Sequence, residues 1–408
     1  MEDEESIIPK TIQILTNLDC NLDCEYCYEN KKDLVNNIED IKNYINIELD
    51  KISREDNIDL LIEPIGGESL MHVELLEEII SYVESLRTKY SIKNISYSIS
   101  SNGTLIGTNR KVQRFIQKYK DIIHIAISID GLKDIHNKHR IYKNTRKGTY
   151  DDALKGLDWL KENQFRMCKV GLKATYTHET IGRLFGSIKY LMSLGVKNDI
   201  GSNPVFEEHW NTKEDSDIIL SQIIKVIDYV FDNNLVNESK ILFHILGKLD
   251  LSNYGYNFVH ENKNWCGSCT HMICLGFDKK VYGCNRFCTS GNDDLKIGYL
   301  TDNGIEITNQ KLIDEVSIQY SLYPDECREC DLHSQCASCA AIPYEVNPND
   351  PKQYIDQKNM CGWTHAVAIG RYYFRDRLKQ YRSQHLDFKY WPEISETRSR
   401  VTCSTESN

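Results

Sequence analysis

The chain has 408 residues, of which 40% are hydrophobic and 27% charged, and this length is sufficient for two domains with separate cores. Its formal net charge of -11 excludes a general nucleic-acid or membrane-surface binder, because such binding needs a basic face. Neither a secretion signal nor an apolar stretch of the roughly 18 residues that span a bilayer is recognisable, so we expect a cytoplasmic protein that binds no membrane.

Short β-rich runs alternate with amphipathic helical stretches from Thr11 to about Phe206. This alternation is typical of βα units around a parallel sheet. It predicts an α/β fold, a partial (βα)6 TIM-like barrel that does not close, with strands near 11–17, 58–65, 94–101, 122–129, 168–177 and 197–205. A helical stretch then leads to a small Cys-rich part. The expected domains are 1–211 (barrel), 212–262 (helical bridge), 263–370 (Cys-rich domain) and 371–408 (C-terminal helix and tail).

Three cysteines follow the first predicted strand with the spacing C-x3-C-x2-C: Cys20, Cys24 and Cys27. Three thiolates on one short loop can hold three irons of a [4Fe-4S] cube and leave the fourth iron without a protein ligand. Such an open position can bind a reacting molecule, as the open position of a catalytic zinc site does. By spacing alone, a zinc site or a set of buried apolar thiols is an alternative.

Polar or glycine residues end the next strands, and in parallel sheets such strand ends meet at one rim. The second strand ends in Gly66-Gly67-Glu68, where the glycines let a ligand approach the backbone and the carboxylate can accept from an ammonium. Asn102 ends the third strand and Ser128-Ile129-Asp130 the fourth. The alternative for these last positions is an Asn-Gly turn and a helix cap.

Ten of the fifteen cysteines lie between Cys266 and Cys361. In a long cytosolic protein, disulfides are unexpected and metal or catalytic roles come first. Closely spaced thiols suit either zinc or iron–sulfur clusters. These ten are Cys266, Cys269, Cys274, Cys284, Cys288, Cys327, Cys330, Cys336, Cys339 and Cys361.

The triad with Tyr26 before its last cysteine, followed by Gly66-Gly67-Glu68, resembles the signature of radical S-adenosylmethionine (SAM) enzymes. The later cysteines resemble the SPASM domain of radical SAM peptide maturases, relatives of anaerobic sulfatase-maturating enzymes. The resemblance implies a SAM-binding [4Fe-4S] cluster on Cys20, Cys24 and Cys27 that cleaves SAM to a 5'-deoxyadenosyl radical. It assigns the SAM amino group to Gly66, Gly67 and Glu68, the SAM carboxylate to Lys173, the adenine to Tyr26, and SAM or substrate contacts to Asn102, Ser128 and Asp130.

The same resemblance implies two auxiliary [4Fe-4S] clusters in the SPASM domain. One would be held by Cys327, Cys330, Cys336 and Cys361. The other would take Cys339, Cys284 and two of Cys266, Cys269 and Cys274, of which we choose Cys266 and Cys269. Cys288 is the expected spare. Two residues separate Cys336 from Cys339, where the family has three, so this assignment departs from the pattern.

Asn285 follows Cys284 at a position where sulfatase maturases of this architecture carry an aspartate base. An amide cannot accept a proton from substrate at neutral pH, which counts against formylglycine synthesis. We therefore expect a radical SAM oxidoreductase that cross-links a ribosomally made precursor peptide, with a Cys thioether as first choice. The alternatives are a C–C or C–O cross-link, epimerisation or sulfatase maturation, or a non-catalytic zinc or iron–sulfur scaffold.

The expected partners are the precursor peptide and an external electron donor of the flavodoxin or ferredoxin type. Only about ten residues precede the first predicted strand, so we expect a leader-binding function, if needed, on a separate protein. The basic and aromatic segment 371–379 offers two interpretations, a grip for an acidic leader peptide or a C-terminal helix that packs its aromatic rings.

Overall fold

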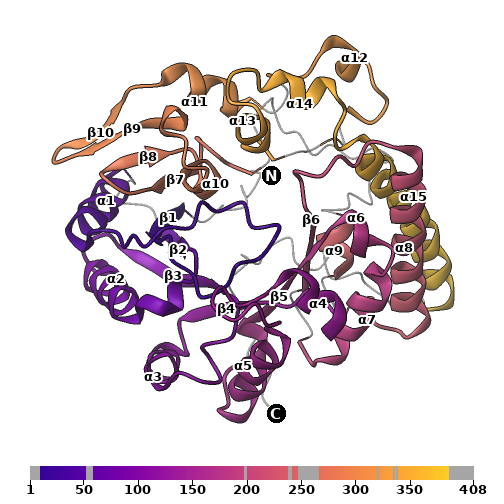
Figure 1. The fold of residues 1–408 in the computed structure, drawn as a ribbon, viewed down its shortest axis with the longest axis horizontal. Helices are drawn as coiled ribbons and strands as arrows, with labels where there is room; N and C mark the ends of the chain where they lie inside the picture. Colours follow the sequence, from indigo (N-terminus) through magenta and orange to yellow (C-terminus); the bar gives the residue numbers. More distant parts are fainter. Residues whose placement is uncertain are drawn as a thin grey trace, which may run out of the picture.

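The computed structural model describes residues 10–51, 58–196, 200–237, 241–246, 266–318, 321–333, 336 and 339–385. Figure 1 shows a curved sheet with helices along its outer side and the Cys-rich part above it. Within the described residues, no helix is long and apolar enough to cross a membrane. The expectation that no disulfide forms is wrong for Cys168, which is disulfide-bonded.

Six parallel strands form the first part of the sheet, in the order of the sequence from β1 to β6. Each predicted strand is confirmed within a few residues. β6 ends this side of the sheet and does not pair with β1, so the barrel stays open. The strands are β1 (Lys10–Asn17), β2 (Ile58–Gly66), β3 (Ile92–Ser101), β4 (Ile123–Ser128), β5 (Val170–Tyr176) and β6 (Ile200–Pro204).

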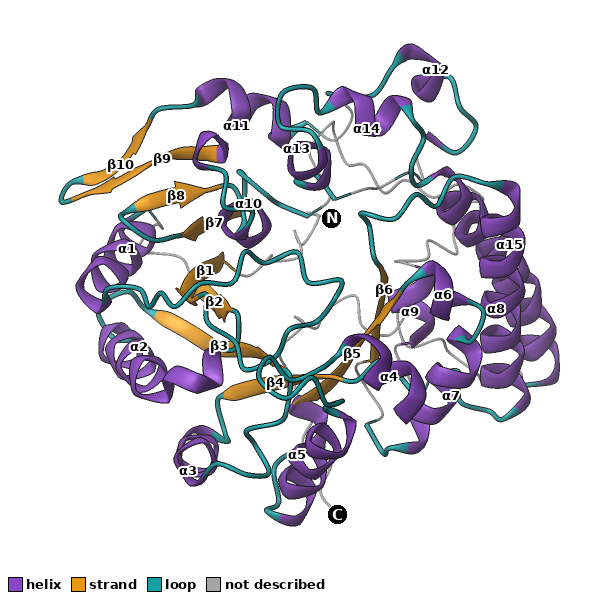
Figure 2. Ribbon diagram, viewed as in Figure 1, coloured by secondary structure: helices purple, strands orange, loops and turns teal. Residues whose placement is uncertain are grey.

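The sheet continues past β1 into the Cys-rich part, which the sequence did not predict. β7 pairs in parallel with β1, aligning Gln13 with Cys274, and three antiparallel strands follow it. The Cys-rich part therefore shares a single ten-stranded sheet with the barrel rather than forming a separate layer (Figure 2). These strands are β7 (Met272–Leu275), β8 (Lys280–Tyr282), β9 (Lys296–Thr301) and β10 (Gly304–Ile307).

Helices cover the outer face of the barrel because each has one apolar stripe that must be buried. The first begins after Asn37, whose side chain accepts from the backbone N–H groups of Glu39 and Asp40, and it buries Ile41, Ile45 and other apolar residues. The barrel helices are α1 (Ile38–Asp50), α2 (Val73–Leu86), α3 (Arg110–Tyr119), α4 (Lys133–His139), α5 (Tyr150–Glu162), α6 (His178–Ile181) and α7 (Leu184–Ser193), with 3-10 turns η1 (Ser69–His72) and η2 (Met167–Lys169).

Short helices connect the Cys-rich segments. Two longer helices, α8 and α15, pack against each other at the side of β6 (Figure 1). The remaining helices are α8 (Lys213–Asp232), α9 (Ile241–Leu246), α10 (Asn285–Thr289), α11 (Gln310–Ser317), α12 (Asp325–Arg328), α13 (Ile342–Val346), α14 (Lys352–Asp356) and α15 (Cys361–Gln384), with the turn η3 (Asp293–Leu295). Much of the predicted helical bridge lies outside the described residues.

The basic and aromatic segment 371–379 lies within α15 and packs against α8. Phe374 is fully buried, and Arg377 pairs with Asp228 and Asp232 of α8. The packing interpretation accounts for these contacts. α15 is continuous from Cys361 to Gln384, so the domain boundary predicted at residue 370 falls inside one helix.

Candidate active site

The cysteine triad lies on the loop that follows β1, at the carboxyl edge of the parallel strands. Main-chain hydrogen bonds hold this loop: Asp23 N–H donates to Ile141 O at 2.8 Å, Glu25 N–H to His139 O at 3.2 Å, and Cys27 N–H to Cys24 O at 3.1 Å. Two of these bonds go to the segment after β4. The loop conformation is thus imposed by a distant part of the chain.

All three triad thiols are partly buried. Burial, followed by the negative charge of Glu68, raises the pKa of Cys20 to about 12, and burial also raises the pKa values of Cys24 and Cys27. Without metal these thiols are therefore neutral at pH 7. A bound metal would reverse this preference, and loading would release protons.

The two glycines at the end of β2 lie against the start of the triad loop. A Cβ atom on Gly66 would come within 2.1 Å of Asn17 O, and one on Gly67 within 2.2 Å of Asp19 O. No side chain fits at such distances. The Gly66-Gly67 pair thus lets the β2 end and the triad loop approach each other, in addition to any role toward a ligand.

Glu68 was expected to face a ligand ammonium, but its carboxylate is buried and joins two strand ends. One oxygen accepts from Asn102 N–H at 2.7 Å and the other from Leu70 N–H at 3.2 Å. Burial raises the pKa of Glu68 to about 7, against the lowering effect of these bonds. The Asn102 side chain donates to Asn21 Oδ1 at 2.8 Å, which links the β3 end to the triad loop.

Asp130 lies at the centre of a buried polar group that also contains Tyr26, another predicted site residue. Its carboxylate accepts from Arg140 Nε at 2.9 Å, from Thr175 N–H at 2.9 Å and from the Tyr26 hydroxyl. Burial alone would raise the pKa of Asp130, but the Arg140 guanidinium and His136 outweigh it and hold this pKa below its ordinary value. Asp130 therefore stays ionised and orients its neighbours.

Arg140 is the site residue that sequence reasoning missed. Its guanidinium lies over the Tyr26 ring at 5.3 Å and close enough to Cys24 to lower the pKa of that thiol against the effect of burial. The only sequence signal was its position ten residues after Asp130 in a Cys-triad protein. A guanidinium is suited to bind a carboxylate with two hydrogen bonds.

Ser128 and Lys173 are aligned on the paired strands β4 and β5. The Lys173 ammonium is exposed and donates to Ser100 Oγ of β3 at 2.7 Å, across the strand between them. The contact links β5 to the end of β3. The SAM carboxylate assigned to Lys173 has a second candidate partner in Arg140.

Eight of the ten C-terminal thiols gather in two groups of four. In the first group, Cys339 and Cys266 interact electrostatically with Cys284, and Cys269 N–H donates at 3.1 Å to the carbonyl oxygen of Gly283, the residue before Cys284. The pKa of Cys361 responds likewise to Cys336, Cys327 and Cys330. The remaining two, Cys274 and Cys288, are buried, and Cys274 Sγ donates to Leu275 O at 3.6 Å.

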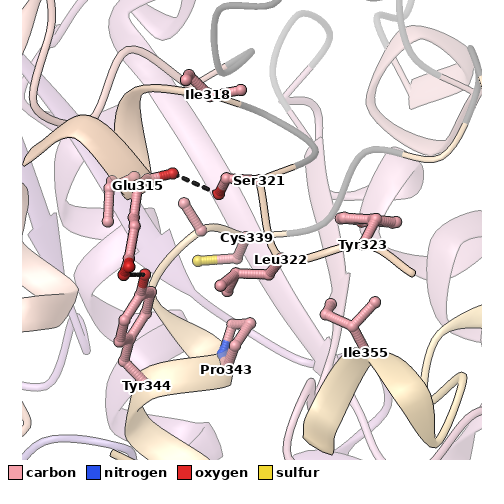
Figure 3. A pocket seen from close by; sticks show the side chains of 11 residues that line it. Glu315, Ile318, Ser321, Leu322, Tyr323, Cys339, Pro343, Tyr344 and Ile355 are labelled. Carbon is pink, nitrogen blue, oxygen red and sulfur yellow. Dashed lines mark hydrogen bonds between the residues drawn. The ribbon is translucent and has the colours of Figure 1, made fainter. Parts of the chain in front are cut away.

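Cys339 also borders a hollow in the Cys-rich part, shown in Figure 3 with its sulfur among Leu322, Pro343 and Tyr344. The Tyr344 hydroxyl donates to Glu315 at 3.0 Å on one side of it. Across the described part of the chain, no group of three or more His, Cys, Asp or Glu side chains is preformed for a single metal ion.

The residues present fit a [4Fe-4S] cluster with three protein ligands. Three thiols share one loop, two glycines leave the backbone accessible beside it, and a guanidinium lies next to Cys24. Thiolates are the usual protein ligands of such clusters.

Comparisons with known proteins agree with this arrangement. The Radical SAM superfamily model matches residues 14–176. Uncharacterized protein MJ0907 of Methanocaldococcus jannaschii is 36% identical over 264 residues, which are 63% of this chain and 84% of the relative. A cysteine-type anaerobic sulfatase-maturating enzyme of Clostridium novyi is 26% identical over 358 residues, covering 82% of this chain and 89% of that enzyme.

Solved structures share the fold. Native anSMEcpe with bound AdoMet and Cp18Cys peptide superposes with a TM-score of 0.64 at 18% identity, covering 91% of this chain and all 100% of that one. Streptococcus suis SuiB bound to precursor peptide SuiA gives a TM-score of 0.52 at 13% identity, covering 85% of this chain and 74% of SuiB. The likeness extends beyond the barrel into the Cys-rich part.

Proposed function

The chain belongs to the radical SAM superfamily, and from this premise we propose that it modifies a ribosomally made precursor peptide by forming a cross-link, most simply a thioether from a peptide cysteine. Its family implies SAM and one [4Fe-4S] cluster, and its relatives include peptide- or protein-modifying enzymes. The observation that carries the proposal is the proximity of the triad loop to the first group of four thiols. The side-chain amide of Asn285 donates to the Tyr28 hydroxyl at 3.4 Å. Asn285 directly follows Cys284 in the sequence, and Tyr28 directly follows Cys27.

The chain's own residues would bind and orient the reactants. When bound, the cluster and SAM supply the 5'-deoxyadenosyl radical that abstracts hydrogen from the peptide. Cys20, Cys24 and Cys27 would hold that cluster, and the backbone at Gly66-Gly67 would receive the SAM amino group. Arg140, oriented by Asp130, and Lys173 offer the cations for the SAM carboxylate. Holding SAM in one orientation lowers the activation barrier of the chemical step, and this effect needs no additional contact with the peptide.

Auxiliary clusters are proposed on Cys266, Cys269, Cys284 and Cys339, and on Cys327, Cys330, Cys336 and Cys361. Their thiol grouping supports this assignment, with Cys274 and Cys288 outside both sets. An external carrier of the flavodoxin or ferredoxin type would supply the electron for SAM cleavage, and the one electron released when the C–S bond closes would pass by way of these sites to an acceptor of the same type. A separate leader-binding protein is a further proposed partner.

Asn285 supports cross-linking over formylglycine synthesis. Its backbone N–H donates to Gln13 Oε1 at 2.9 Å and its side-chain amide to Tyr28, so it lies at the barrel edge beside the triad. An amide at this place cannot take a substrate proton at neutral pH. Sulfatase maturation remains the second candidate because of the likeness to the Clostridium novyi enzyme over 82% of the chain.

The test begins with anaerobic reconstitution and a count of iron and sulfide per chain. We expect about twelve irons, four for each of three cubes. SAM cleavage to 5'-deoxyadenosine should be lost in Cys24→Ala with roughly two thirds of the iron retained. Zinc without sulfide would indicate a non-catalytic scaffold and overturn the proposal. Cysteine-rich peptides encoded near the gene are then assayed by mass spectrometry for a loss of two hydrogens per thioether.

A further inference from the structure

A mostly buried cation, Arg286, lies between the barrel and the Cys-rich part. This residue lies on α10 of the Cys-rich part, two positions after Cys284. Three segments meet at its guanidinium: the triad loop after β1, the loop after β6, and α13. Since β7 occupies the other side of β1 and β6 ends the sheet, no hydrogen-bonded ladder joins β6 to the Cys-rich part.

Arg286 contacts two carboxylates and two aromatic rings. Nε donates to Glu345 of α13 at 2.6 Å, and a terminal nitrogen donates to Glu207 after β6. The plane stacks 4.4 Å from the centre of the Tyr28 ring and lies 5.8 Å from that of Phe206. Its side chain is only 12% exposed. A lysine could pair with one carboxylate but could not form this fork or stack.

Residues of both proposed cluster sites lie next to this cation. Tyr28 directly follows Cys27 of the triad, and the Arg286 charge opposes the effect of burial on the pKa of Cys339 in the first four-thiol group. Asn30 N–H, on the triad loop, donates to Thr289 O at the end of α10 with a length of 3.2 Å. α10 and the triad loop are thus joined at two points, by Arg286 against Tyr28 and by Thr289 bonded to Asn30.

We infer that Arg286 is a positioning residue that clamps the triad loop, the β6 loop and the Cys284 segment together, and so sets the separation between the SAM-cluster site and the first auxiliary site. This inference rests on the proposed function only in naming those two sites as cluster sites. Its charge also lies where it favours the more reduced, more negative state of the auxiliary centre.

The experiment compares Arg286→Gln with Arg377→Gln in the reconstituted full chain. Arg377 is a matched control, because it also pairs with two carboxylates, Asp228 and Asp232, and lies 5.5 Å from an aromatic ring, that of Phe231. Arg377 lies on α15, and both of its carboxylate partners lie on α8. Hydrogen–deuterium exchange of the triad-loop peptide reports on the clamp, since the Asn30 amide is bonded to α10.

We expect triad-loop exchange to become at least about tenfold faster in Arg286→Gln and to stay unchanged in Arg377→Gln. The midpoint potential of the auxiliary centre, followed by electron paramagnetic resonance, should move to a more negative value in Arg286→Gln. In Arg286→Lys the potential should stay near the wild-type value while exchange still rises, which separates charge from clamping.

Wild-type exchange in Arg286→Gln, or equal acceleration in both variants, would overturn the inference. If Arg286→Gln does not fold, Glu207→Gln is the alternative variant, because it removes only the ion pair between Arg286 and the loop after β6. It should raise exchange in the triad loop and in the loop after β6, and in no other segment. Exchange needs neither peptide nor turnover. A chain that cleaves no SAM but loses protection in Arg286→Gln would therefore refute the proposed function and leave the clamp supported.

Discussion

Replacing Asp130 with asparagine tests the buried polar group beneath the triad loop. Asp130 is 1% exposed and Arg140 is 8% exposed. The variant therefore leaves the Arg140 guanidinium without its carboxylate partner in a site that is shielded from water. Asn can still accept from Thr175 N–H, but its amide N–H₂ would face the Arg140 and Tyr26 donors. Breaking a buried pair in this way costs about 3–5 kcal/mol. The unfolding equilibrium should therefore shift by roughly two to four powers of ten.

The effect has a pH dependence whose sign follows from the lowered pKa of Asp130, which the Arg140 charge sustains against burial. A carboxyl group whose pKa is lower in the folded than in the unfolded protein stabilises the fold above its unfolded pKa, about 3.9. This contribution is lost as the pH falls through the folded pKa. The difference between wild type and Asp130→Asn should be full at pH 7 and should shrink below about pH 4.

The assay is urea unfolding of the metal-free protein, followed by circular dichroism. Asp134→Asn is the control: it removes a carboxylate only four positions away whose side chain is 64% exposed and pairs with exposed Arg183. Exposed pairs contribute at most about 1 kcal/mol. If Asp130→Asn costs no more than Asp134→Asn, the reasoning about the buried pair is refuted.

Further predictions concern the glycines and cysteines of the site. Gly67→Ala should destabilise the protein by about 1–3 kcal/mol, because its Cβ would lie 2.2 Å from Asp19 O. Gly186→Ala, in a helix and with no atom within 4 Å of the new Cβ, should stabilise by about 0.5–1 kcal/mol, and thermal unfolding measures both. Cys284→Ala should lose about four irons per chain, whereas Cys288→Ala should retain the wild-type count. Equal iron loss in the two cysteine variants would contradict the thiol grouping.

Local patterns were sufficient for the barrel. Period-two runs and helical stripes are short-range signals, and they placed all six parallel strands within a few residues. The spacing of Cys20, Cys24 and Cys27 likewise marks a single loop, whose chemistry depends on neighbours in sequence. The Gly66-Gly67 pair was recognisable because close backbone approach leaves room for no other residue type.

Contacts between distant segments could be decided only by the tertiary structure. The pairing of β7 with β1 joins residues more than 250 positions apart, and no local pattern encodes that choice. The orientation of a polar side chain is equally non-local: Glu68 turns to the backbone of Asn102, and Arg140 reaches Asp130 and Tyr26. Sequence therefore determined which residues stand at the rim, whereas burial and long-range pairing determined which of them face one another.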